Sequence, residues 1–287
     1  MRRKRLSLII ALLLLALLVG GLGWQVYATV RQERLNHALI AAIEQNNPRL
    51  ALELLKQGAD PNAKAVTDKS QPLWQLLWNA LWHRKQAQSG PCALMLSVEN
   101  NDGSLTQALL RQGAYDVNAR FTNWEFFPGT TLLMAEIDNG DADTAQALLE
   151  HGAQVNAQND WGESALMRAR DDRCAELLLR WGADVNARDH HRDTVLMHAV
   201  HYNGLWIARL LERGVDVNAA NDSGVTVLMS AAWAGQVKNV RLLLAHGANP
   251  NAKDDMGKTV LYVERHGDVI VNAQNIIPIL KQAGAKE

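Results

Sequence analysis

The chain has 287 residues, of which 48% are hydrophobic and 21% charged, with a formal net charge of -1. Four basic residues lie at positions 2–5, and without them 25 Lys and Arg stand against 30 Asp and Glu, a net charge of -5. Nucleic-acid-binding proteins usually carry a basic stripe, so this composition argues against a nucleic-acid partner. The large apolar share is sufficient for a continuous folded core.

The amino-terminal segment predicts a membrane anchor. Residues 1–5 are basic, and the eighteen residues from Leu6 to Gly23 carry no charge. As a helix these eighteen residues would span about 27 Å, close to the hydrocarbon thickness of a bilayer. Trp24 and Tyr27 follow this run and suit the membrane interface.

The charge bias across this segment predicts its orientation. Basic residues concentrate before the apolar run, which places residues 1–5 in the cytoplasm by the positive-inside rule. We therefore expect a transmembrane signal-anchor over residues 6–27 and a linker over residues 28–34. The remainder would lie in the periplasm, as part of a single-pass inner-membrane protein.

A cleaved signal peptide is the alternative, with residues 26–28 (Val-Tyr-Ala) as the cleavage site. The apolar run is longer than the 7 to 15 residues usual in a signal peptide, which favours the retained anchor. Both interpretations export the rest of the chain.

After the linker, the chain consists of imperfect copies of one pattern, clearest over residues 225–252. The pattern reads T-x-L-M-x-A, then G, then L-L-x-x-G-A-x-x-N-A. Its apolar spacing predicts two short helices that are joined at Gly235, and Gly247 would end the second helix in the left-handed conformation. The hydroxyl of Thr226 is expected to cap the first helix.

The helix-ending glycines give the spacing of the copies. Their steps are 55, 39, 30, 32, 33 and 37 residues, which predicts seven units. The glycines are Gly58, Gly113, Gly152, Gly182, Gly214, Gly247 and Gly284.

This pattern closely resembles the ankyrin repeat, which has a period of about 33 residues and the consensus T-P-L-H where this chain has T-V-L-M. The resemblance implies an all-α solenoid of about seven helix-turn-helix units over residues 35–287. Met replaces the family's His, so packing is expected in place of the hydrogen bonds that the His makes between units. The methionines are Met95, Met134, Met167, Met197 and Met229.

Two insertions interrupt the repeats. The first predicts an extra helix over about residues 71–88, with Trp74, Trp78 and Trp82 along one face. Neighbouring positions are apolar as well, which favours packing on the side of the solenoid over a partner-binding or membrane-contacting surface. The second insertion lengthens the hairpin between residues 119 and 130.

The resemblance implies that a partner protein binds the concave surface, which hairpin tips and the exposed ends of first helices form. We expect one acidic zone, which would steer a basic partner. A second zone would expose large aromatic side chains, which bury much area at a small entropy cost. The expected partner-binding residues are Trp124, Phe126, Asp138, Trp161, Asp171, His190, His191, His201, Tyr202 and Trp233.

Catalytic motifs are absent: the chain has no G-x-S-x-G, H-E-x-x-H or Gly-rich phosphate loop. His190, His191 and His201 were weighed as metal ligands, but we expect no metal because no carboxylate or Cys lies at ligand spacing. Cys92 and Cys174 fall in different units, so two buried free thiols are expected in place of a disulfide.

The expected function is a non-catalytic protein–protein interaction module that uses no cofactor and no small-molecule substrate. Two uses remain open, a scaffold for an envelope enzyme and an immunity protein that occludes a toxin delivered to the periplasm. An enzyme or a metal-binding protein is the less favoured alternative.

Overall fold

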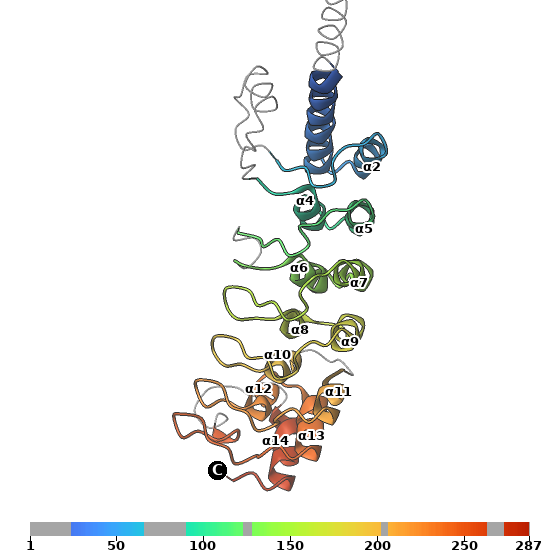
Figure 1. Ribbon diagram of the computed structural model, residues 1–287. Helices are drawn as coiled ribbons and strands as arrows, with labels where there is room; N and C mark the ends of the chain where they lie inside the picture. Colours follow the sequence, from blue (N-terminus) through green and yellow to red (C-terminus); the bar gives the residue numbers. More distant parts are fainter. Residues whose placement is uncertain (1–23, 66–89, 123–127, 202–205, 263–272, 287) are drawn as a thin grey trace, which may run out of the picture. The chain divides into compact units, whose positions relative to one another are not determined.

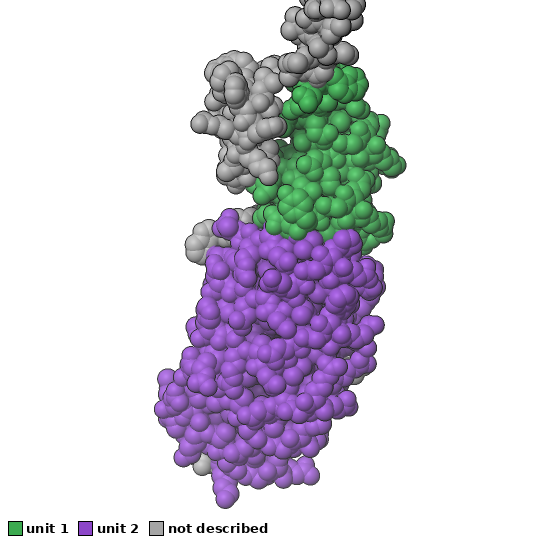
Figure 2. All heavy atoms as spheres, in the orientation of Figure 1, with its two compact units in different colours: residues 1–116 green, residues 117–287 purple. Residues whose placement is uncertain are grey.

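The computed structural model describes residues 24–65, 90–122, 128–201, 206–262 and 273–286 (Figure 1). The chain divides into two compact units, residues 1–116 and 117–287, which Figure 2 colours separately. Within the described ranges every regular element is a helix, and the extended pairing is limited to isolated β-bridges.

The first unit contains helices that follow one another in antiparallel pairs. Its first helix includes residues 24–44 and is followed by α2 (Pro48–Lys56). Asn47 caps α2, because its side chain accepts a hydrogen bond from the Leu50 N–H (3.2 Å), and Pro48 occupies the first turn, where its missing N–H is not needed. The second pair is α4 (Ala93–Glu99) and α5 (Gly103–Arg111).

The second unit repeats the same helix pair, and the loops between successive pairs project from one side of the helices (Figure 1). One hydrophobic core runs through this unit from Leu133 to Leu280. The helices are α6 (Leu132–Asn139), α7 (Ala142–Glu150), α8 (Ala165–Arg168), α9 (Asp172–Arg180), α10 (Val195–Ala199), α11 (Trp206–Glu212), α12 (Val227–Trp233), α13 (Val237–Ala245) and α14 (Ala273–Gln282).

The methionines that replace the family's His lie in the core of this unit. Met134, Met167, Met197 and Met229 are at most 3% exposed. An unbranched thioether fills irregular space between helices without a hydrogen-bond partner. The predicted packing role is therefore confirmed for these four residues.

The Asn of the N-A pair that ends a repeat links that copy to the next at five positions. Asn156 Nδ2 donates to the carbonyl of Gly182 (3.2 Å), and Asn156 Oδ1 accepts from the N–H of Asp184 (2.8 Å). The same two hydrogen bonds are made by Asn62, Asn118, Asn218 and Asn251.

All seven helix-ending glycines have positive φ, as predicted, between +75° and +96°.

The side chain of the N-cap residue caps three of the first helices, but Ser164 before α8 and Thr226 before α12 make no such bond. Thr131 and Thr194 accept from the N–H groups of the methionines three residues later, each at 3.3 Å, and Cys92 Sγ does the same at 3.4 Å. Thr226 occupies the N-cap of α12, but its buried hydroxyl has no hydrogen-bond partner among the described residues. The prediction that Thr226 caps this helix with its hydroxyl is therefore wrong.

Cys92 and Cys174 are buried free thiols, as predicted. Burial raises the pKa of both, and at Cys174, where a hydrogen bond with Asp171 adds to burial, the pKa reaches about 12. Both thiols are therefore neutral and unreactive at ordinary pH.

Several expectations fall outside the described residues. These include the apolar run of residues 6–23, the insertion helix of residues 71–88 and its three tryptophans, and the full repeat count. Among the helices that the structure describes, none combines the length and apolarity needed to cross a bilayer. The described start of the first helix exposes Trp24 (71%) and Tyr27 (60%).

Candidate functional site

Four hairpin tips that the structure describes in the second unit are each held by one Asn or Asp side chain. Asn159 Oδ1 accepts hydrogen bonds from the N–H groups of Trp161 (3.0 Å) and Glu163 (2.9 Å). These two hydrogen bonds, to the residues two and four positions later, fix the turn from within its own hairpin. The equivalent residues Asp189, Asn221 and Asp254 make the same pair of bonds.

Backbone hydrogen bonds join neighbouring tips. The N–H of His190 donates to the carbonyl of Trp161 (2.9 Å), and the N–H of Asp222 donates to the carbonyl of His191 (3.0 Å). Gly162 permits this approach, because a Cβ there would lie 2.8 Å from the backbone nitrogen of His190. The tips therefore form one ribbon in which the spacing between successive side chains is fixed.

Three of the expected partner-binding residues come together on this ribbon. Trp161 is 46% exposed, and His190 and His191 on the next tip are also exposed. Met256, two tips further along the chain, is 80% exposed. We call these four residues the tip face.

Other expected contact residues have different surroundings. Trp233, treated above as an exposed aromatic residue, is half-buried against the hydrophobic core, and its Nε1 has no hydrogen-bond partner among the described residues. His201 follows α10 and reaches the surface. Partial burial of its ring and, to a smaller extent, the charge of His198 lower its pKa. Trp124, Phe126 and Tyr202 lie outside the described residues.

The acidic residues expected in the groove have structural partners. Arg168 forms an ion pair with Asp138, in which its Nε lies 2.9 Å from Oδ2, and a second ion pair with Glu163 at 2.7 Å. Asp171 is the N-cap of α9, since its Oδ1 accepts from the N–H of Cys174 (2.9 Å). Asp138 is thus neutralised by Arg168, which weakens the expected steering of a basic partner.

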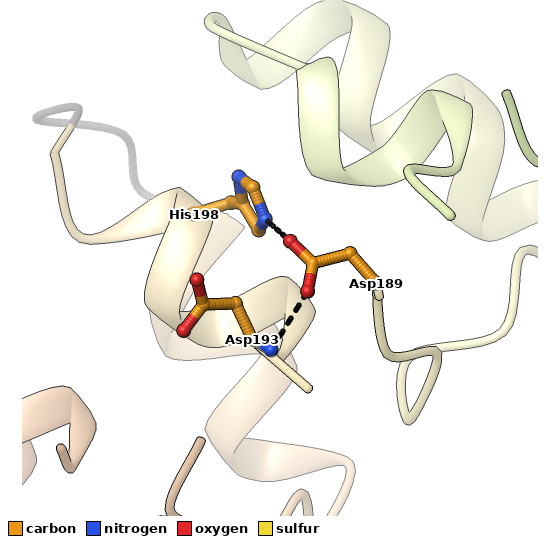
Figure 3. A group of neighbouring side chains, drawn as sticks. All are labelled: Asp189, Asp193 and His198. Carbon is orange, nitrogen blue, oxygen red and sulfur yellow. Dashed lines mark hydrogen bonds and ion pairs between the residues drawn. The ribbon is translucent and has the colours of Figure 1, made fainter. Parts of the chain in front are cut away.

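A polar cluster that the sequence analysis missed lies at the base of the tip that carries His190 and His191. Asp189 Oδ2 lies 3.0 Å from Nε2 of His198, and Asp189 Oδ1 accepts from the N–H of Asp193 at 2.9 Å (Figure 3). One potential ligand atom from each of the three residues lies within 4.8 Å of the others. Asp189 has a side chain only 5% exposed, and His198 one 25% exposed.

A sequence signal for this cluster existed. His198 directly follows the buried Met197, at the position that Arg168 occupies after Met167 one copy earlier. In both copies this side chain reaches back to the acidic residues of its own hairpin. The candidate ligands His190, His191 and His201 are not members of the cluster, which uses His198 instead.

The comparisons with known proteins agree with this architecture. A profile of ankyrin repeats in three copies matches residues 94–189 and 166–254, and a profile of the single ankyrin repeat matches residues 34–66. Because these matches cover more than half of the chain, the protein belongs to the ankyrin repeat family. A search of curated proteins found none that matches it. Ankyrin repeats serve as protein–protein interaction modules, and the family is in general not catalytic.

Proposed function

We propose that this protein is a non-catalytic, membrane-anchored ankyrin-repeat protein that binds a partner protein through its tip face on the periplasmic side of the membrane. The observation that carries the proposal is the exposure of Trp161, His190 and His191 on adjacent tips that backbone hydrogen bonds join. Large side chains on a backbone that is already ordered lose little entropy on binding.

The chemistry of the tip face indicates the kind of surface it recognises. Trp161 offers a flat apolar ring, and Met256 an adaptable apolar side chain. His190 and His191 add imidazole nitrogens that donate or accept hydrogen bonds. The partner that fits is a folded protein with an apolar centre and polar groups around it.

A binding assay with matched tryptophan variants tests the proposal. The full-length chain, purified in detergent, would be cross-linked to envelope extract beside a Trp161→Ala, His190→Ala, His191→Ala variant. The control is Trp181→Ala, since Trp181 is 43% exposed but lies at the C-cap of α9, away from the hairpin tips. We expect one stoichiometric partner on wild type and control, and its loss from the triple variant.

Equal retention of that partner by all three proteins, with circular dichroism showing that each is folded, would place the binding surface elsewhere. The captured partner also separates the two uses. A toxin that is bound very tightly would indicate immunity, whereas an envelope enzyme bound more weakly would indicate a scaffold.

Export through a retained anchor is part of the same proposal. The basic residues 2–5, the apolar run of residues 6–23 and the exposed Trp24 and Tyr27 support it. Intact mass measured on the membrane-extracted chain should show no cleavage after Ala28, and protease added to spheroplasts should digest the repeats. A chain that starts at residue 29 would indicate a signal peptide, and digestion only after lysis would contradict export.

A further inference from the structure

The hairpin before α8 shows how a polar cluster in this fold is ordinarily balanced. Asn159 Nδ2 donates to Glu163 Oε2 (2.8 Å), and Arg168 Nη1 donates to the same oxygen (2.7 Å). The Glu163 carboxylate therefore receives one amide donor and one permanent cation. Arg168 shares its charge with Asp138, so charge-assisted hydrogen bonds within the protein hold both carboxylates.

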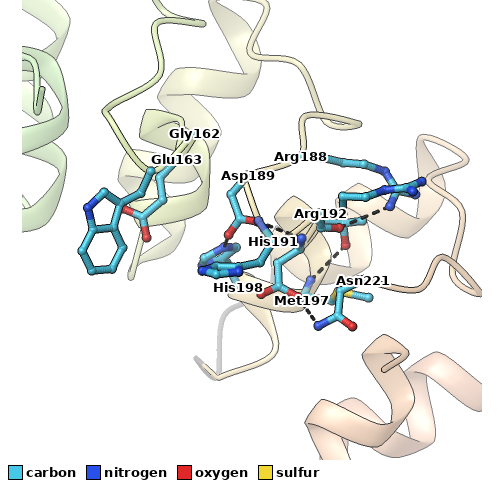
Figure 4. A network of polar contacts seen from close by, with 12 residues as sticks. Gly162, Glu163, Arg188, Asp189, His191, Arg192, Met197, His198 and Asn221 are labelled. Atoms are coloured by element: carbon cyan, nitrogen blue, oxygen red, sulfur yellow. Dashed lines mark hydrogen bonds and ion pairs between the residues drawn. The ribbon is translucent and has the colours of Figure 1, made fainter. Parts of the chain in front are cut away.

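The hairpin before α10 has the same backbone but different charges, and Figure 4 shows its polar contacts together with Glu163 of the preceding hairpin. Asp189 replaces the Asn, so the amide donor becomes a second acceptor next to Asp193. His198 replaces the Arg, and its Nε2 contacts Asp189 at 3.0 Å. Two carboxylates thus face one imidazole, and the Asp189 side chain is only 5% exposed. The carboxylate of Asp189 is therefore buried beside the half-buried Asp193, and a buried carboxylate requires a compensating cation.

Nearby guanidinium groups engage other acceptors. Arg188 Nη1 donates to the carbonyls of Arg192 (3.2 Å) and Ala220 (3.1 Å). The Nε of Arg192 lies 3.8 Å from a carboxylate oxygen of Asp222 on the next tip. In the described contacts these two arginines therefore stabilise the loops. Neither of them supplies a positive charge to the carboxylates of Asp189 and Asp193.

We propose that Asp189, Asp193 and His198 bind a divalent transition-metal ion, for which Zn²⁺ is the best-matched ion. One imidazole nitrogen and two carboxylate oxygens form a ligand set that Zn²⁺ accepts, with a fourth position for water. The ligand atoms lie within 4.8 Å of one another. With metal–ligand bonds of about 2.0–2.2 Å, tetrahedral ligand atoms lie about 3.3 Å apart, so a small closure of the side chains forms the site.

Neighbouring groups already orient the proposed ligands. Asp189 Oδ1 is held by the N–H groups of His191 and Asp193, each at 2.9 Å, which leaves Oδ2 for the ion. Asn221 Nδ2 donates to Asp193 Oδ1 at 2.8 Å, which leaves the other oxygen of that carboxylate available. Hydrogen bonds of this kind fix the orientation of metal ligands and raise affinity.

Calorimetric titration of the metal-free, full-length chain in detergent with zinc chloride tests the proposal. Wild type should bind one ion per chain. Asp189→Asn removes one ligand but restores the amide that Asn159 and Asn221 provide at this position, so the hairpin should still fold. We expect this variant to bind Zn²⁺ more than about 100-fold more weakly.

A second variant and a control complete the experiment. His198→Ser installs the residue found at the equivalent Ser230, and it should lose binding to the same extent. His190→Gln, His191→Gln removes two exposed imidazoles of the same hairpin and should leave binding unchanged. The proposal is overturned if wild type shows no one-to-one binding, if the two ligand variants bind as wild type does, or if the control alone loses binding.

Discussion

The hairpins that precede α8 and α10 have the same backbone and differ in the cation that follows the buried Met. Arg168 carries a permanent charge and joins Asp138 of the preceding helix pair to Glu163 of its own hairpin. His198 is smaller, and the ion pair that the structure describes for it is with Asp189 of its own hairpin. The comparison shows that the repeat places a basic side chain at the same position in both hairpins. Whether this side chain is Arg or His decides whether the carboxylates are paired within the protein or available to bind an ion.

Another carboxylate of the same unit forms no ion pair with any residue that the structure describes. Glu136 of α6 is fully buried, and neither carboxylate oxygen has a hydrogen-bond partner among the described residues. Burial, with the charge of Asp141 as a smaller cause, raises its pKa to about 8. At the equivalent positions the chain has Ser97, Ala169, Ala199 and Ala231.

The largest expected effect comes from breaking the closed cluster. Arg168→Ala leaves Asp138 and Glu163, whose side chains are 18% exposed, without their shared cation. We expect a loss of about 3 kcal/mol in the free energy of unfolding, because removing one partner strands two largely buried charges. Urea unfolding, followed by circular dichroism, measures it.

Arg173→Ala is the matched control, since Arg173 pairs with Asp143 and both side chains are about two-thirds exposed. Solvent screens such a pair, so the loss should stay below about 0.5 kcal/mol. Equal losses for the two variants would show that burial does not distinguish these ion pairs.

Glu136→Gln should have the next largest effect, and the size of that effect depends on pH. The folded state holds a proton on Glu136 up to about pH 8, whereas the unfolded chain releases it near the ordinary value of 4.5. Wild-type stability therefore falls as pH rises between these two values. The variant should match wild type to within about 0.5 kcal/mol at pH 4.5 and be more stable by about 2 kcal/mol at pH 6.

Urea unfolding at both pH values measures this effect, with Glu150→Gln on the exposed side of α7 as the control. The control makes the same charge change in contact with solvent, so it should show no comparable dependence on pH. A stability gain for Glu136→Gln that is equal at both pH values would exclude the buried proton as its cause.

The smallest effect is expected from His198→Ser in the metal-free protein. The substitution removes one hydrogen bond to the buried Asp189 carboxylate and should lower the free energy of unfolding by about 1 kcal/mol. His190→Ser, on the exposed tip, should change it by less than about 0.5 kcal/mol. Thermal unfolding in the presence of EDTA tests both, and a loss that matched Arg168→Ala would make the two hairpins energetically alike.

The repeat architecture could be predicted because it depends on short-range rules. Gly247 ends a helix, apolar spacing defines the buried faces, and Met197 occupies a core position, each within one copy of the pattern. The tip residues Trp161, His190 and His191 followed from the same register. The capping error at Thr226 shows the limit of such rules, because a residue type sets a capability and the local packing decides whether the bond forms.

The site itself depends on contacts between copies and between a hairpin and its helix. Sequence spacing alone did not pair Arg168 with Asp138, which is 30 residues away, or bring His198 against Asp189. It also treated Trp233 as a free contact residue, although the structure packs it on the core.

The sequence by itself determined the helix pairs, their glycine stops and the loops that carry the candidate surface, since these follow from backbone preferences and apolar periodicity. Only the tertiary structure decided which charges are neutralised, which are buried without a partner and which face one another. Those outcomes depend on distances and desolvation, and both arise when one copy stacks on the next.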